Sequence, residues 1–116
     1  MDYKNKSCCE PTATTAPLVD DALTMAMQSL HADWQVHVDK GHENGDGKQW
    51  LERRFEFKDF YHTMAFINAL AWIANQENHH PDCQLGYNYC LVRFNTHTIN
   101  SISENDIICA AKVDAL

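Results

Sequence analysis

Apolar residues recur every three to four positions in three stretches of the chain, a spacing that is typical of amphipathic helices. The pattern predicts helices over residues 20–31, 60–76 and 103–116. Each helix begins at a polar residue whose side chain can cap the first turn. The expected caps are Asp20 or Asp21, Asp59 and Ser103.

Apolar and polar residues alternate in other stretches, as they do in strands that bury one face. The alternation predicts a first strand over residues 33–38 and a second over 50–57. Between them, residues 41–47 hold three glycines with Asn and Asp, a strong turn signal. Two further strands are expected over residues 84–87 and 89–96.

The predicted order of elements is α-β-β-α-β-β-α. Two hairpins with segregated helices favour an α+β fold, with a four-stranded antiparallel sheet and helices on one face. A chain of 116 residues fits one domain, which we expect over residues 18–116. Residues 1–17 contain few large apolar side chains, so we expect a mobile tail there.

The net charge is −7, from 9 Lys and Arg against 16 Asp and Glu, which argues against nucleic acid as a partner. The longest apolar stretches are short and interrupted, so we expect no membrane association. The first residues lack the apolar region of a secretory signal, which favours a cytoplasmic protein.

The five cysteines show no Cys-x-x-Cys spacing, so a disulfide framework or a zinc ribbon is not expected. Cys83, Cys90 and Cys109 stand in apolar surroundings and are expected to be buried. Cys8 and Cys9 fall in the predicted tail, where they are either reactive or incidental.

Three histidines are the strongest candidates for chemistry. His79 and His80 precede Pro81 at a helix exit, and Thr96-His97 ends a predicted strand. Histidine exchanges protons near neutral pH, so a cluster suits acid–base catalysis, provided that the strand ends beside the helix exit. Two alternatives stay open: the side chains only cap helix carbonyls or face solvent, or three imidazoles bind zinc.

The chain resembles the pterin-4a-carbinolamine dehydratases from about residue 18 to 116. The residues that carry the resemblance are His79-His80-Pro81, Tyr87 or Tyr89, Thr96-His97, Asp106, Trp34 and the stretch 55–60. The family usually has a charged residue or His four positions before the first motif histidine, where this chain has Asn75. The departure leaves the orientation of the histidines open.

The resemblance implies dehydration of a 4a-hydroxytetrahydropterin to quinonoid dihydropterin and water, without metal or another cofactor. It implies that His79 and His97 transfer protons and that His80 holds the pterin ring. Residues expected to bind substrate or support the site are Trp34, Glu77, Asn78, Pro81, Thr96 and Asp106.

The resemblance also implies partners. A pterin-dependent aromatic amino-acid hydroxylase would release the substrate. We expect a homodimer or homotetramer joined through sheet edges or the helix beginning at Phe60, with the second strand and residues 84–87 near edges. The alternative function is a non-catalytic binding and dimerisation module, or a repurposed paralogue.

Overall fold

The computed structural model describes residues 2–39 and 47–116. It confirms the α+β fold and the order α-β-β-α-β-β-α. The main elements are α1 (Asp20–Gln28), β1 (Gln35–Asp39), β2 (Lys48–Glu56), α2 (Phe60–Glu77), β3 (Asp82–Leu85), β4 (Tyr89–Phe94) and α3 (Glu104–Asp114). The predicted turn over residues 41–47 lies outside the described residues, Gly47 apart.

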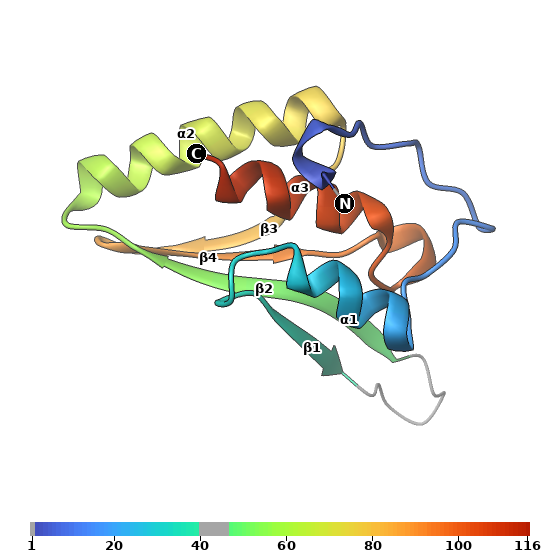
Figure 1. Ribbon diagram of the computed structural model, residues 1–116. Helices are drawn as coiled ribbons and strands as arrows, with labels where there is room; N and C mark the ends of the chain where they lie inside the picture. Colours follow the sequence, from blue (N-terminus) through green and yellow to red (C-terminus); the bar gives the residue numbers. More distant parts are fainter. Residues whose placement is uncertain (1, 40–46) are drawn as a thin grey trace.

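The four strands form one antiparallel sheet in the order β1-β2-β4-β3 (Figure 1). The strands β2 and β4 are therefore central, and β1 and β3 are the edges. The expectation that the second strand lies near an edge is wrong, because it pairs with β1 on one side and with β4 on the other. The edge position of β3 agrees with the expectation for the neighbouring residues 84–87.

The helices cover one face of the sheet (Figure 1). Leu51 of β2 pairs with Phe94 of β4 on that face, and both side chains are fully buried. Ile107 and Val113 of α3 belong to the same core cluster. Alternate residues such as Glu52 face the opposite side, which the described helices leave uncovered. Alternation along the strands thus determines which side chains lie under the helices.

Two of the three predicted caps are confirmed. The Asp59 carboxylate accepts from the His62 N–H at 2.8 Å, and Ser103 forms a complete capping box with Asp106. The prediction for α1 is wrong, because Val19 holds the N-cap position without a side-chain bond. Asp20 and its neighbour lie inside the first turn, where a carboxylate interacts favourably with the helix dipole.

The third strand begins two residues earlier than predicted and ends at Leu85. A tight turn causes this shift, since the Gly86 N–H donates to the Tyr89 carbonyl at 3.0 Å. A Cβ atom at Gly86 would lie 2.2 Å from a ring carbon of Tyr89, so a larger residue there would have to displace the Tyr89 ring. Cys83 of β3 is exposed, contrary to the expectation that it is buried, because the strand lies at the sheet edge.

Residues 2–17, which we call the N-terminal segment, run beside α3 (Figure 1). Lys6 forms an ion pair with Glu104 at 2.6 Å, and the Cys9 N–H donates to the Asn105 side chain at 3.0 Å. Tyr3 packs against the core cluster. The expected mobility of this segment stays a prediction. Across the described residues, no helix is long and apolar enough to cross a bilayer.

Candidate active site

The exit of α2 turns His79 inward and His80 outward. Asn78 ends the helix in the left-handed conformation with φ of 51°, which Asn tolerates better than most residues. The His79 N–H then donates to the Ala74 carbonyl at 3.1 Å. After this turn His79 is only 7% exposed, whereas His80 is exposed before Pro81.

A buried ion-pair geometry joins His79 to the start of α3. Its Nε2 atom lies 2.6 Å from Oδ1 of Asp106, which is fully buried. The imidazole also stacks on Phe94, with ring centroids 6.1 Å apart and planes inclined by 8°. The side chain is thus held on its edge by a carboxylate and on its face by a phenyl ring.

The second oxygen of Asp106 ties the end of β4 to α3. Its Oδ2 atom accepts from the Thr96 hydroxyl at 2.7 Å and from the Ser103 N–H at 2.9 Å. Thr96 and Ser103 hydroxyls also lie 2.7 Å apart. One carboxylate therefore completes a helix cap, anchors a strand end and contacts His79.

The end of β4 lies beside the exit of α2, as acid–base clustering requires. Thr96 and His79 contact the same carboxylate, and His97 follows Thr96 as the first residue of a short 3₁₀ turn, His97–Ile99. His97 is exposed. Within the described part of the chain, no hydrogen bond joins His80 or His97 to His79.

Trp34 is a core residue that reaches the site through Phe94. Its indole N–H donates to the Asp114 carboxylate at 2.7 Å, and its ring lies 6.1 Å from the rings of Phe55 and Phe94. Phe94 also stacks on His79, so Phe94 lies in contact with both rings.

Glu77 faces the N-terminal segment instead of the histidines. Its Oε1 atom accepts from the Cys8 N–H at 2.8 Å, and its Oε2 atom lies 3.8 Å from Nζ of Lys112. Glu77 therefore anchors the N-terminal segment, and it does not take the place of the charge missing at Asn75.

A small hollow of about 210 Å³ lies on the face of the sheet that the described helices leave uncovered, and none of the three candidate histidines lines it. Its lining residues are Asp39, Lys48, Trp50, Asp82, Arg93 and Asn95. Asp82 follows His80 by two residues, and Asn95 precedes His97 by two. Asn95 is not among the site residues that the sequence predicts.

Asn95 presents an unsatisfied acceptor at this hollow. The side chain is 4% exposed, its amide N–H donates to the Gln49 carbonyl at 2.5 Å, and its Oδ1 atom has no partner. A buried carbonyl oxygen without a hydrogen bond is costly to the stability of the fold. Arg93 on the same wall is held by Glu52 at 2.6 Å.

Glu52 is charged at neutral pH although it is largely buried. Burial opposes ionisation, but hydrogen bonds from the Trp50 and Arg93 side chains outweigh it and hold the pKa of Glu52 below its ordinary value. Trp50 in turn stacks on His37, with centroids 5.7 Å apart. Hydrogen bonds to Glu52 thus link Trp50 and Arg93 of the hollow.

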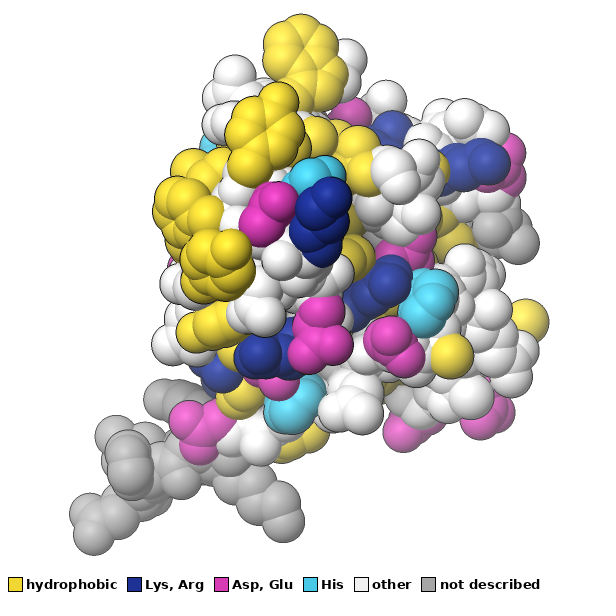
Figure 2. Space-filling model, turned by 90° about the vertical axis from the view of Figure 1, so that its left-hand side faces the viewer, with side chains coloured by type: hydrophobic (Ala, Val, Ile, Leu, Met, Phe, Trp, Pro, Cys, Tyr) yellow, Lys and Arg dark blue, Asp and Glu magenta, His cyan; other side chains and the backbone are white. Residues whose placement is uncertain are grey.

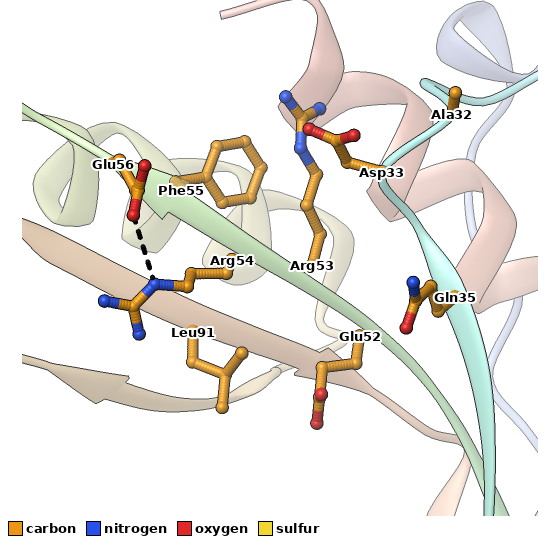
Figure 3. Close-up of a pocket in the computed structure, with 9 residues that line it drawn as sticks. All are labelled: Ala32, Asp33, Gln35, Glu52, Arg53, Arg54, Phe55, Glu56 and Leu91. Atoms are coloured by element: carbon orange, nitrogen blue, oxygen red, sulfur yellow. Dashed lines mark ion pairs between the residues drawn. The ribbon is translucent and has the colours of Figure 1, made fainter.

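A wider hollow of about 560 Å³ lies beside the last residues of β2, which have no β1 partner because β1 begins only at Gln35 (Figure 3). Its charged groups pair among themselves or with neighbours: Arg54 lies 3.5 Å from Glu56, and Arg53 lies 2.7 Å from Asp114. Its wall includes Leu91, four residues before Asn95, or roughly 13 Å along a strand. None of the three candidate histidines lines it.

No group of three or more His, Cys, Asp or Glu side chains among the described residues is arranged to hold a metal ion. The expected independence from metal stays a prediction.

Comparison with known proteins identifies the family. Residues 16–116 match the family described as Pterin 4 alpha carbinolamine dehydratase. A relative from Legionella pneumophila (strain Corby) that carries the pterin-4-alpha-carbinolamine dehydratase name is 44% identical over 115 residues, which cover 99% of this chain and 95% of the relative.

Two solved structures share the fold. A transcriptional coactivator/pterin dehydratase from Brucella melitensis has a TM-score of 0.72 and 30% identity, covering 86% of this chain and 97% of its own. A pterin dehydratase-like protein described as a RuBisCO assembly factor in the alpha-carboxysome has a TM-score of 0.58 and 27% identity, covering 73% and 89%. Together with the full-length relatives, these matches show that the chain belongs to the pterin-4a-carbinolamine dehydratase family, a family of hydro-lyases.

Proposed function

We propose that the protein dehydrates a 4a-hydroxytetrahydropterin to quinonoid dihydropterin and water by histidine acid–base catalysis. Family membership implies a pterin substrate. The observation that carries the mechanism is the buried His79–Asp106 pair, with exposed His80 and His97 on the adjoining chain ends. The reaction needs one proton donor for the departing hydroxyl and one acceptor for a ring-nitrogen proton.

His79 is suited to accept the proton. Ser103 N–H and the Thr96 hydroxyl occupy Oδ2 of Asp106, so Oδ1 accepts from Nε2–H of His79. In the neutral imidazole this hydrogen bond places the proton on Nε2 and leaves the lone pair on Nδ1. Nδ1 of His79 is therefore the proposed base.

His97 and His80 act from the exposed side. His97 is accessible and is our proposed acid for the 4a-hydroxyl group. His80 is proposed to hold and polarise the pterin ring.

The proposed reaction would consume the pterin product of another enzyme. A pterin-dependent aromatic amino-acid hydroxylase is the proposed source of the substrate, and a reductase can recycle the product. The test is a dehydratase assay on a 4a-hydroxytetrahydropterin, in which product formation is monitored through the absorbance of the quinonoid dihydropterin. Turnover no faster than the spontaneous reaction would refute the proposed activity.

A non-catalytic binding role is the second candidate, and one observation favours it. The outer face of α2 exposes Tyr61 and Trp72, which are 78% and 69% exposed, and Tyr87 is also exposed. Hydrophobic side chains gather along one flank of the molecule (Figure 2). Such a role does not require the His79–Asp106 pair, so the assay distinguishes the two functions.

We propose that this α2 face joins copies of the chain in a two-fold homo-oligomer. We expect a wild-type mass of two or four times 13.3 kDa by light scattering at micromolar concentration. Trp72→Glu buries a charge in the interface and should weaken association roughly 30-fold or more. Met25→Glu is the matched control, because Met25 is 69% exposed on α1, and it should leave the mass unchanged. A wild-type mass of one chain contradicts this proposal.

We also propose that catalysis is independent of metal. The purified protein should contain no stoichiometric metal by elemental analysis, and a chelator should leave kcat and KM unchanged. The reason is that proton transfer by imidazoles needs no Lewis acid. A tightly bound ion whose removal abolishes turnover would overturn this prediction.

A further inference from the structure

Two thiols far apart in the sequence meet between the N-terminal segment and α3. Sγ of Cys8 lies 3.7 Å from Sγ of Cys109, and it also lies 3.6 Å from the carbonyl oxygen of Asn105. Cys109 is fully buried on α3, one turn beyond Asp106. Cys8 is partly exposed, so a small oxidant can reach it.

A second pair of thiols, Cys83 and Cys90, share a side-chain hydrogen bond but are less suited to a disulfide. Cys83 lies opposite Val92 in the sheet, so Cys90 is diagonal to it. Diagonal positions on antiparallel strands are roughly 7–8 Å apart. Disulfides usually need about 4.4–6.8 Å between Cα atoms. Cys9 is exposed and bonds through its backbone to Asn105.

We propose that Cys8 and Cys109 form a reversible disulfide under peroxide and that this bond locks the N-terminal segment onto α3. The Cys8 thiolate attacks a peroxide oxygen, which breaks the O–O bond, gives a sulfenic acid and releases hydroxide or alkoxide as water or alcohol. Cys109 sulfur then attacks the sulfenic sulfur. Its thiol proton and the departing hydroxide leave as water, so two thiols are oxidised and one peroxide is reduced.

The order of attack follows from the surroundings of the two thiols. A hydrogen bond with Cys8, burial and the nearby carboxylates of Asp106 and Glu77 raise the pKa of Cys109 far above its ordinary value. Cys109 therefore stays protonated and serves as the resolving thiol, while the accessible Cys8 reacts first.

The disulfide would fasten the N-terminal segment to the end of α2 and the start of α3, the two elements that hold the His79–Asp106 pair. Cys8 N–H is already bonded to Glu77, two residues before His79. Cys9 is bonded to Asn105, which precedes Asp106. A covalent link would prevent the N-terminal segment from detaching from α3. It would also lower the conformational entropy of the unfolded chain by closing a loop of about 100 residues.

The test is limited peroxide treatment of the whole protein, followed by intact mass, peptide mapping and thermal melting. We expect the loss of two hydrogen atoms, a Cys8–Cys109 linked peptide, and a Tm higher by roughly 5–15 °C that a thiol reductant reverses. Cys8→Ser and Cys109→Ser should each abolish all three effects, whereas Cys9→Ser should retain them.

Cys8→Ser suffices if Cys109→Ser does not fold, because Cys8 is not buried in the core. A linkage through Cys83 or Cys9, over-oxidation of Cys8 without a link, or a linked protein with unchanged Tm would each overturn the proposal. These readouts do not depend on dehydratase activity, so they remain informative even if the proposed function fails.

Discussion

Replacing His79 or His97 with Ala should lower kcat for dehydration by roughly 10²-fold or more, because each variant lacks one of the two proposed proton-transfer groups. His97 is exposed, so His97→Ala should fold normally and isolate the chemical effect. The measurement is steady-state turnover of a 4a-hydroxytetrahydropterin, with circular dichroism and Tm recorded for the same preparations.

His79 needs a second variant, because its removal leaves the buried Asp106 without a partner. That loss alone costs about 1–3 kcal/mol of stability. His79→Gln retains an N–H that can reach Asp106 but cannot take up a proton, so it should fold and remain slow. The exposed His31 provides the control, and His31→Ala should keep kcat within about threefold of wild type. Wild-type turnover in both His97→Ala and His79→Gln would show that these residues do not transfer the protons.

Asp106→Asn should lower kcat nearly as much as the loss of His79 does, because the substitution changes the tautomer of His79. The Ser103 N–H can only donate, so the amide oxygen of the new Asn must remain on that side. Its NH₂ group then faces Nε2 of His79, which must become an acceptor and carry its proton on Nδ1 instead. The proposed base is lost, and we expect kcat to fall by roughly 10²-fold or more.

The matched control for Asp106→Asn is Ser103→Ala, which removes the other member of the capping box. It should lower the free energy of unfolding by about 1 kcal/mol, while the Asp106–His79 contact and the tautomer persist. Asp106→Asn itself loses a charge-assisted hydrogen bond and should cost about 1.5–3 kcal/mol. If both variants reduce kcat only in proportion to their loss of folded protein, Asp106 is a structural cap and not a positioning residue.

The helix caps that were predicted correctly depend on residues that are close in the sequence. Asp59 and Ser103 cap their helices because a short side-chain oxygen can reach the N–H groups two or three residues ahead, whatever the remainder of the chain does. Local rules failed at the start of α1, where two Asp residues gave an ambiguous signal. The Leu18 N–H there bonds to the Ile102 carbonyl at 2.8 Å, and such a contact is not visible in local patterns.

The residues of the candidate site were proposed from the sequence, and their arrangement was not. Spacing indicated that His79, His80 and His97 belong together, yet it could not show that one is buried and two are exposed. That difference arises from the left-handed turn at Asn78 and from Asp106, 27 residues further along the chain. The contribution of Phe94 and Asn95 likewise depends on which strand becomes the neighbour of β2.

By itself the sequence determined the helices, the alternating strands, the α+β class and the family resemblance, because periodicity and capping act over a few residues. Only the tertiary structure decided the strand order, the burial of His79, the unsatisfied Asn95 and the meeting of Cys8 with Cys109. These features join residues tens of positions apart. They arise from the packing of the helices on one face of the sheet, which local sequence patterns do not predict.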